Sequence, residues 1–247
     1  MPETQPFVLT IAGFDPSGGA GLTADIKVMQ AHRVRDLCVC TAITIQNEDQ
    51  FIDCRWLSDD EIKEQLHILL YRYEIRYVKI GILPSLPLLN ELLDILHAHR
   101  SDMRIIWDPV LKASAGFDFY VPSTLSGLSQ IMEKIYLATP NAKEWEILQK
   151  HLPPAYLPCH IFIKSVSAAD GFVEDLLLTK EGAIHGYTSS LLHGNSKHGS
   201  GCVLSSAIAS ALATGDDLNY AIHRARCYTR SYLLSAPGRS GTHFFAL

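Results

Sequence analysis

The stretch that decides the fold is residues 7–32, FVLTIAGFDPSGGAGLTADIKVMQAH. It opens with FVLTIAG, a continuous apolar run of the kind that forms a buried parallel strand. A glycine-rich turn follows, and then Leu22, Ile26 and Met29 recur at helical spacing. Residues 7–32 therefore predict one strand–turn–helix unit of an α/β protein.

The same alternation of strands and helices continues along the chain. The segment 58–73 starts with Ser58 and has Glu61 three residues later, which is the capping-box pattern of a helix start. The alternation predicts a doubly wound, mainly parallel sheet with helices on both faces, in a single domain over residues 1–247. The segments 173–179 and 180–187 are candidates for an antiparallel pair. Further strands are predicted at 36–46, 75–83, 104–111, 134–141 and 160–166, and further helices at 85–100, 142–152, 203–215 and 218–235.

The composition limits the classes of function. The chain has 247 residues, 47% of them hydrophobic and 19% charged, which suits a protein with a sizeable core. Its net charge of -5 argues against general nucleic-acid or membrane-surface binding, because both need a broad basic field. An anionic ligand must therefore be held by local devices such as helix N-termini, single lysines or a metal ion.

The sequence patterns argue against export and against membrane insertion. The segment MPETQPFVLTIAG lacks the basic start and the long apolar stretch of a secretory signal. The apolar run at 202–215, CVLSSAIASALATG, is broken by serines and is shorter than the ~20 residues of a membrane span. The six cysteines contain no C-x-x-C pair, so we expect free thiols in a cytoplasmic protein.

Two glycine-rich turns precede apolar helices. The first, AGFDPSGGAGLTAD at 12–25, suits a ligand cradle and a tight structural turn equally well. The second places Gly199, Ser200 and Gly201 before an apolar helix, where free backbone N–H groups and the helix dipole predict an anion hole for a transferring phosphoryl group. The same dipole predicts a lowered pKa for Cys202, with a small space-filling cysteine as the alternative.

Polar residues follow several of the apolar strands. Gln46 ends the strand at 36–46, Asp108 follows an apolar strand, and Asn141 stands three residues before Glu144 at the start of the next helix. Asp108, Asn141 and Glu144 are predicted to meet beyond the sheet and to hold Mg²⁺, mostly through water. Taken alone, Gln46 is a polar strand end and Asn141 is a helix N-cap, so both alternatives stay open.

The order of the motifs resembles one family. The chain carries, in the order seen in the hydroxymethylpyrimidine/phosphomethylpyrimidine kinases of thiamine biosynthesis, the segments TIAGFDPSGGAG, TADIK, TAITIQN, VKIGIL, DPV, TPNAKE, IKS, KHGSGCVLSSAIA and APGRSGTHFF. The resemblance covers the chain from Val8 to about Phe244, and DPSGGAG and HGSGC are its most specific segments. It implies a ribokinase-like fold.

The resemblance also implies roles for single residues. Cys202 is expected beside the substrate hydroxymethyl group at the anion hole, as a polarising or proton-accepting neighbour rather than a covalent nucleophile. Gln46 suits an aminopyrimidine, because one amide can satisfy both a ring nitrogen and the amino group beside it. The implied site comprises Gly199, Ser200, Gly201 and Cys202 for catalysis, Gly13, Asp25, Gln46, Ile82 and Val110 for the substrate, Lys164 and Asn141 for the nucleotide, and Asp108 and Glu144 for the metal.

The function implied by the resemblance is ATP- and Mg²⁺-dependent phosphorylation of 4-amino-5-hydroxymethyl-2-methylpyrimidine, of its monophosphate, or of both. The partners are then the pyrimidine and ATP, and the resemblance further implies a homodimer. Pyridoxal kinase of the same fold is one alternative, because pyridoxal also carries a 5-hydroxymethyl group. A non-catalytic pyrimidine sensor is another, because Ser165 and Val166 stand where the family has glycines. A Cys–His hydrolase is disfavoured, because the spacing of His198 and Cys202 does not predict their contact.

Overall fold

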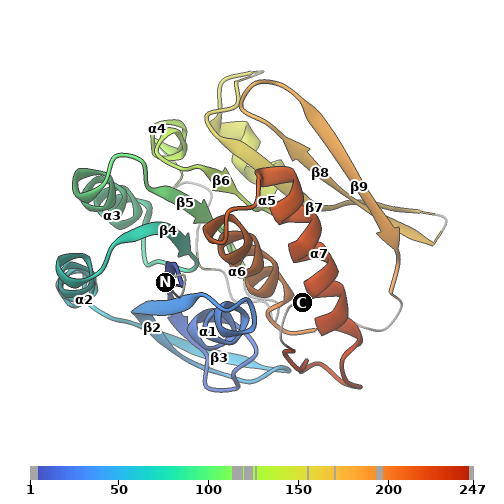
Figure 1. The fold of residues 1–247 in the computed structure, drawn as a ribbon, viewed down its shortest axis with the longest axis horizontal. Coiled ribbons are helices and arrows are strands. Elements are labelled where there is room, and N and C mark those ends of the chain that lie inside the picture. Colours follow the sequence, from blue (N-terminus) through green and yellow to red (C-terminus); the bar gives the residue numbers. More distant parts are fainter. Residues whose placement is uncertain are drawn as a thin grey trace.

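The computed structural model describes residues 5–112, 119, 125, 127–154, 156–169, 171–192 and 197–244. Within these residues one nine-stranded sheet runs in the order β3-β2-β1-β4-β5-β6-β7-β8-β9, with helices on both faces (Figure 1). The predicted doubly wound α/β architecture is therefore confirmed.

The middle of the sheet is parallel and its two edges are antiparallel. β3 pairs antiparallel with β2, and β8 pairs antiparallel with both β7 and β9, as expected for 173–179 and 180–187. β3 was not predicted, because Asp53 and Arg55 interrupt its apolar residues. The parallel strands are β1 (Phe7–Phe14), β2 (Arg35–Gln46), β4 (Ile75–Ile80), β5 (Arg104–Trp107), β6 (Leu137–Ala138) and β7 (His160–Ala169), and the antiparallel ones are β3 (Phe51–Trp56), β8 (Phe172–Leu178) and β9 (Ile184–Ser190).

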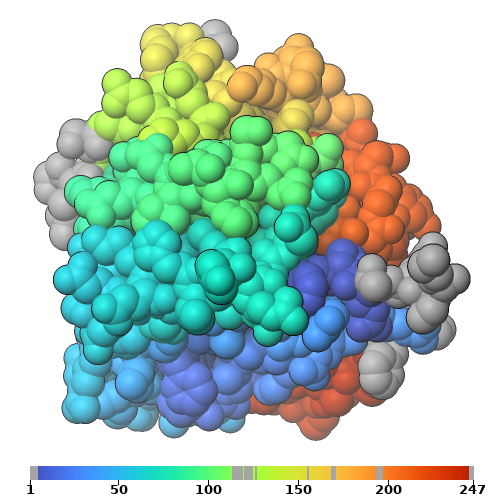
Figure 2. All heavy atoms as spheres, turned by 60° about the vertical axis from the view of Figure 1, so that its left-hand side comes forward, coloured from blue at the N-terminus to red at the C-terminus, as the bar shows by residue number. Residues whose placement is uncertain are grey.

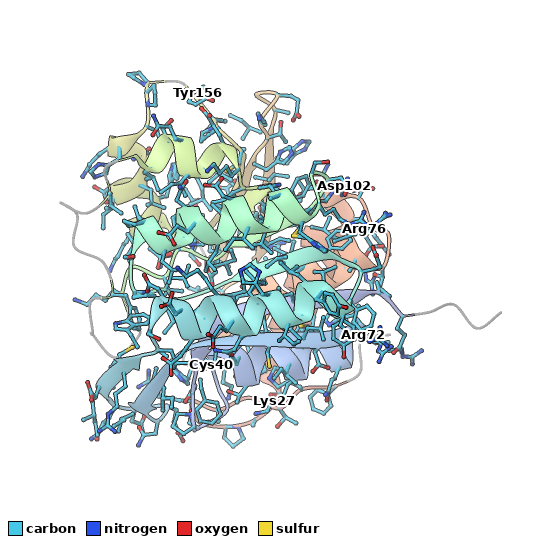
Figure 3. All side chains as sticks on the ribbon, turned by 90° about the vertical axis from the view of Figure 1, so that its left-hand side faces the viewer. Lys27, Cys40, Arg72, Arg76, Asp102 and Tyr156 are labelled. Carbon is cyan, nitrogen blue, oxygen red and sulfur yellow. The ribbon has the colours of Figure 1, made fainter. Side chains whose placement is uncertain are left out.

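The helices divide between the two faces of the sheet. α2 and α3 lie side by side on one face, where they form a continuous surface (Figures 2 and 3). α6 packs between α1 and α7 on the other face (Figure 1). None of the described helices is long and apolar enough to cross a membrane. The helices are α1 (Gly21–Ala31), α2 (Asp59–Arg72), α3 (Leu86–His99), α4 (Leu128–Glu133), α5 (Ala142–Leu148), the 3₁₀ helix η2 (Gln149–His151), α6 (Ser200–Ala213) and α7 (Leu218–Leu234).

Each face of the sheet covers its own apolar core. Leu66, Leu89 and Trp107 are buried in the core beneath α2 and α3. Val28 and Ile208 are buried in the core beneath α1, α6 and α7. These continuous apolar layers explain why the strands between them read as unbroken hydrophobic runs.

Local capping fixes where several helices start. Ser58 accepts from the Glu61 N–H while Glu61 accepts from the Ser58 N–H, so the predicted capping box is present. Four predicted elements are at least three residues shorter than expected. The strand at 75–83 ends at Ile80, the strand at 104–111 ends at Trp107, and the strand at 134–141 is reduced to Leu137–Ala138. The helix at 142–152 ends at Leu148 before a 3₁₀ turn.

The strand order reverses between β1 and β4. β1 lies between β2 and β4, so the connections leave it toward opposite edges of the sheet. In sheets of this kind a crevice opens beyond the carboxyl ends of the strands at the reversal. Gly13 near the end of β1 and Gly81 just after β4 lie at this point.

Candidate active site

A cavity of about 640 Å³ lies beyond the carboxyl ends of the central strands. Its walls come from the ends of β1, β2, β4 and β5, from the start of α6 and from β8, β9 and α7. Of the residues proposed from the sequence, Asp25 does not line it. The others do: Gly13, Gln46, Ile82, Asp108, Val110, Asn141, Glu144, Lys164, Gly199, Ser200, Gly201 and Cys202.

One end of the cavity combines apolar walls with an amide. A Cβ at Gly13 would lie 2.6 Å from Ile82 Cδ1, so glycine lets Ile82 pack against β1 in its present position. Gln46 Nε2 donates to Thr44 Oγ1 over 2.8 Å, and Thr44 Oγ1 donates to the carbonyl of Phe14 over 2.9 Å. Among the described residues no group donates to Gln46 Oε1, which leaves this oxygen available to a ligand.

Asp25 lies behind the cavity wall in a sealed ion pair. Its carboxylate accepts from Lys79 Nζ over 2.8 Å, from Thr10 Oγ1 over 2.6 Å and from Ser206 Oγ over 2.6 Å. Both Asp25 and Lys79 have fully buried side chains. This geometry does not support the direct contact with a bound ring that was expected of Asp25, because its oxygens are already occupied; Lys79, which lines the cavity, was missed.

A second ion pair, Asp108–Lys164, belongs to the cavity wall. Lys164 Nζ donates to Asp108 Oδ1 over 2.8 Å, and Thr139 Oγ1 donates to the same oxygen over 3.2 Å. Burial alone would raise the pKa of Asp108, but the ammonium groups of Lys164 and Lys79 hold that pKa below its ordinary value. Asp108 is therefore a carboxylate at neutral pH, at the edge of the space that a ligand can enter.

Asn141 and Glu144 form a capping box at the start of α5. Asn141 Oδ1 accepts from the Glu144 N–H over 2.9 Å, and Glu144 Oε2 accepts from the Asn141 N–H over 2.7 Å. The N-cap alternative for Asn141 is therefore correct, and the residue lines the cavity as well. Burial raises the pKa of Glu144 above its ordinary value.

The carboxylates fit Mg²⁺ only in a largely hydrated form. The described residues contain no group of three or more His, Cys, Asp or Glu side chains able to enclose a metal. Asp108 and Glu144 nevertheless line the same cavity, and the charge of Asp108 adds to burial in raising the pKa of Glu144. Mg²⁺ commonly takes one or two carboxylates and completes its shell with water and substrate phosphates, so these two residues suit it.

The loop Lys197–Gly201 presents backbone donors at the start of α6. Gly199 is the N-cap at φ +71, and a Cβ there would overlap the carbonyl oxygen of Gly19. No side chain caps α6, nor α1, whose start also lies at the cavity; the other long described helices, α2, α3 and α7, are capped by Ser58, Ser85 and Asp217. Two uncapped helix starts at one cavity are suited to an anionic ligand.

Cys202 corrects one sequence-based expectation. It sits in the first turn of α6, where the helix dipole alone would lower its pKa. Burial nevertheless raises the pKa of the Cys202 thiol to about 11, and the charges of Asp25 and Asp108 oppose the favourable effect of Lys79. The expected lowered pKa is therefore wrong: burial outweighs the favourable charge of Lys79, and the group is a thiol at neutral pH.

His198 joins the two glycine-rich turns. Its Nε2 donates to Asp15 Oδ2 over 2.8 Å, and Asp15 also accepts from the N–H groups of Ser17 and Ala20. Burial opposes ionisation of Asp15, but the bonds from His198 and Ser17 hold its pKa below the ordinary value. The His198 ring therefore bonds to Asp15. This agrees with the expectation that His198 and Cys202 do not form a catalytic Cys–His pair. No local sequence pattern indicated the contact.

Ser165, beside Lys164, adopts a conformation that favours glycine. Its φ is +54, in the left-handed region. Its N–H donates to Asp175 Oδ1 over 2.7 Å, and Asp175 is itself held by Arg226 Nε over 2.7 Å. Ser165 therefore holds a left-handed position that is braced from β8 and α7.

The ribokinase-like fold of this chain is shared with proteins of known structure. The structure of Staphylococcus aureus pyridoxal kinase in complex with AMP-PCP and pyridoxal has a TM-score of 0.81 with this chain, at 22% identity, and the match covers 98% of this chain and 95% of that one. This likeness concerns the fold, and it confirms the expected architecture.

The chain belongs to the phosphomethylpyrimidine kinase family, whose model matches residues 15–243. The hydroxymethylpyrimidine/phosphomethylpyrimidine kinase of Streptomyces coelicolor is 30% identical over 92% of this chain and 88% of its own length. The bifunctional thiamine biosynthesis protein ThiDN of Methanocaldococcus jannaschii is 29% identical over 93% of this chain. The chain spans about half of that relative, 53% of its length.

Proposed function

We propose that this chain transfers a phosphoryl group from ATP to the hydroxymethyl oxygen of 4-amino-5-hydroxymethyl-2-methylpyrimidine, to a phosphate oxygen of its monophosphate, or to both. One observation carries the proposal. A single cavity joins the amide of Gln46 to the Asp108–Lys164 pair and to the uncapped start of α6. A ring held at the first end would direct its hydroxymethyl group toward a phosphate held at the second.

The ring end suits an aminopyrimidine. Gln46 has a free amide oxygen for the ring amino group, and its Nε2 can turn from Thr44 to a ring nitrogen. Ile82 and Val110 supply apolar wall beside it. Such a site discriminates through its polar pairing, because an analogue that cannot pair covers the half-buried amide of Gln46 without giving it a partner.

The transfer end supplies positioning and charge. The substrate oxygen bonds to the γ-phosphorus while the bond to the bridging oxygen breaks, leaving its electron pair on ADP, and the hydroxyl proton passes to a transferred phosphoryl oxygen. Donors at Gly199–Gly201 and the Lys164 ammonium would hold the charge on that group. Cys202, as a thiol, polarises the hydroxyl rather than removing its proton.

Magnesium would bind at Asp108 and Glu144, mostly through water, and neutralise phosphate charge when present. Asn141 keeps Glu144 in place through the capping box. Lys164 spans the gap between these carboxylates and the loop: a Cβ at Gly201 would lie 3.3 Å from Lys164 Nζ, so glycine leaves room for the ammonium.

The test is turnover with product masses. The hydroxymethylpyrimidine, its monophosphate and pyridoxal are incubated separately with the chain, ATP and Mg²⁺. A pyrimidine mono- or diphosphate supports the proposal. If pyridoxal phosphate is the sole product, the chain is a pyridoxal kinase and the proposed substrate is wrong. If the pyrimidine binds but no product forms, the chain is a pyrimidine sensor and the proposed kinase activity is wrong.

Gln46→Leu probes the substrate end separately. We expect it to raise the KM for the pyrimidine by about 10- to 100-fold and to leave the KM for ATP within about twofold, because one buried polar pair is lost. Gln30→Leu, an exposed position on α1, is the matched control. Equal changes in both KM values would contradict a role in ring recognition.

Assembly and location complete the proposal. We propose one domain over residues 1–247 that acts as a homodimer in the cytoplasm. The six free cysteines support a reducing compartment. The exposed side chains of Ile43 and Ile52 at the β2–β3 edge support association. Light scattering after size exclusion tests the homodimer, and a monomer mass at working concentration would contradict it.

A further inference from the structure

Lys197 is a buried cation immediately before the uncapped start of α6. Its exposed fraction is 4%. Its ammonium donates to the carbonyl of Ala236 and, over 2.6 Å, to the carbonyl of Gly238. No carboxylate of the described residues forms an ion pair with it. Burying an ammonium against carbonyls alone is costly, so this arrangement calls for an explanation.

Both acceptors belong to a segment that follows α7. We call Ser235–His243 the closing segment. It folds back on itself, because the Thr242 N–H donates to Ser235 Oγ over 2.7 Å. Its Gly241 lies where a Cβ would overlap the ring of Tyr232, and its His243 ring is 4.8 Å from that ring.

The closing segment contacts the loop Lys197–Gly201 at His198 as well. The His198 N–H donates to the carbonyl of Arg239 over 2.8 Å. Tyr232, with 2% of its surface exposed, donates through its hydroxyl to the carbonyl of His198 over 3.1 Å. The loop is thus held on one side by Asp15 and on the other by Lys197, Tyr232 and the closing segment.

The bonds on both sides of the loop Lys197–Gly201 hold its backbone N–H groups in a fixed direction, which matters for binding an anion. Backbone N–H groups stabilise a transferring phosphoryl group only if they already point at it, since a loop that must reorganise loses that advantage. The loop is rich in glycine and therefore has little stiffness of its own. External bonds have to supply the rigidity.

We propose that Lys197 and Tyr232 are positioning residues of the phosphoryl-transfer site, which fasten the loop Lys197–Gly201 to the closing segment and so orient the N–H groups at the start of α6. This inference rests on the proposed function for the identity of the anion. Both residues act through the loop, and neither lines the cavity.

The test uses the full chain with Lys197→Met, Tyr232→Phe and the conservative Lys197→Arg. Lys134→Met and Tyr156→Phe are the matched controls. Lys134 binds Asn90 and Asp94, and Tyr156 binds Glu133, at positions that do not line the cavity. Figure 3 shows Tyr156 at the opposite end of the molecule from Lys27, whose ammonium binds the first glycine-rich turn.

The first readouts need no turnover. We expect hydrogen exchange of the His198 and Val203 amides to rise about tenfold in Lys197→Met and Tyr232→Phe, because their bonds depend on the loop. The affinity of inorganic phosphate, followed by the amide shifts of Gly199–Gly201, should fall about tenfold. The controls and Lys197→Arg should stay within about twofold of the unsubstituted chain.

Kinetics supply the final readout. With the pyrimidine we expect kcat to fall about tenfold while its KM stays within about twofold, since ring binding does not involve the loop. Unchanged exchange or unchanged phosphate affinity in both variants overturns the inference. Unchanged kcat in an active enzyme also overturns it. A chain that never turns over substrate, but whose variants lose phosphate as described, refutes the proposed function and leaves the inference supported.

Discussion

Two lysine–aspartate pairs contact α6, through Ser206 and Ser205, and they differ in burial rather than in chemistry. In Asp25–Lys79 and in Asp108–Lys164 the closest distance between nitrogen and oxygen is 2.8 Å. Both side chains of the first pair are 0% exposed, whereas Lys164 in the second is 14% exposed. The first pair is enclosed by Thr10 and Ser206, and only its Lys79 borders the cavity, whereas both residues of the second pair line it.

The difference shows how one motif of charges serves two purposes. The first pair has no exposed side-chain surface and all its bonds are made within the fold, so it contributes mainly to the stability of the fold. A pair at a cavity wall can reorganise when phosphate or metal arrives, because water already reaches its lysine. Loss of a sealed partner should therefore affect the free energy of unfolding, and loss of a partner at the wall should affect turnover.

Lys79→Met should have the largest effect. It leaves the Asp25 carboxylate buried without its cation, and the free energy of unfolding should fall by about 3–5 kcal/mol. Urea unfolding of the purified variant measures this change. The double variant Lys79→Met/Asp25→Asn, which removes both charges, should recover most of the loss. A double variant as unstable as the single one would contradict the view that an unpaired charge is responsible.

Asp108→Asn should have a small effect on the free energy of unfolding and a large effect on turnover. The Lys164 ammonium left behind can reach water, so we expect the free energy of unfolding to fall by only about 1–2 kcal/mol. Turnover should fall by about 100- to 1,000-fold, because a carboxylate that holds metal and orients Lys164 is lost. Steady-state kinetics and urea unfolding of one preparation give both numbers. If Asp108→Asn keeps its turnover but loses stability, then Asp108–Lys164 stabilises the fold as Asp25–Lys79 does, and its proposed role in turnover is contradicted.

Cys202→Ala tests the group between the pairs, whose pKa responds to Lys79, Asp25 and Asp108 together. A thiol that polarises the hydroxyl without removing its proton contributes modestly, so we expect kcat to fall by about tenfold with the pyrimidine KM little changed. Cys159→Ala, in the core away from the cavity, shows what loss of a buried thiol does by itself. Full activity in Cys202→Ala would leave Cys202 as a space-filling residue.

The smallest effect concerns pH. The folded-state pKa of Asp108 lies below the ordinary 3.8, so the stability it contributes is present above pH 3.8 and is lost as the pH falls through the folded-state value. Wild-type stability should therefore decline more steeply than that of Asp108→Asn between about pH 5 and about pH 3. Urea midpoints across this range measure the slopes; parallel slopes would contradict the pKa shift.

Much of the fold followed from periodic patterns. The unbroken apolar runs predicted the parallel strands, and Ser58 with Glu61 predicted the start of α2. β3 was missed although residues 52–56 alternate apolar and polar side chains, because it is not a continuous apolar run and its alternation spans only five residues. The length of β6 was overestimated because the apolar residues just before Leu137–Ala138 lie in a loop and not in the strand.

The site followed in part. Strand ends and glycine turns indicated the cavity-lining residues, whose roles remain predictions. Lys79 could have been found, since a lone lysine within an apolar strand demands a buried partner. The contact of His198 with Asp15 could not, because nothing local links residues 183 positions apart. The pKa of Cys202 could not either, because it depends on how burial balances against three charges.

That long-range contact has a consequence for folding kinetics. A bond across 183 positions closes a very large loop of chain, and such closures come late because their entropy must be met before any contact forms. The two glycine-rich turns therefore meet only when the rest of the sheet is in place. A ligand held between them recognises the finished molecule and not the folding transition state. Its binding energy accordingly lengthens the lifetime of the native state and leaves the folding rate unchanged.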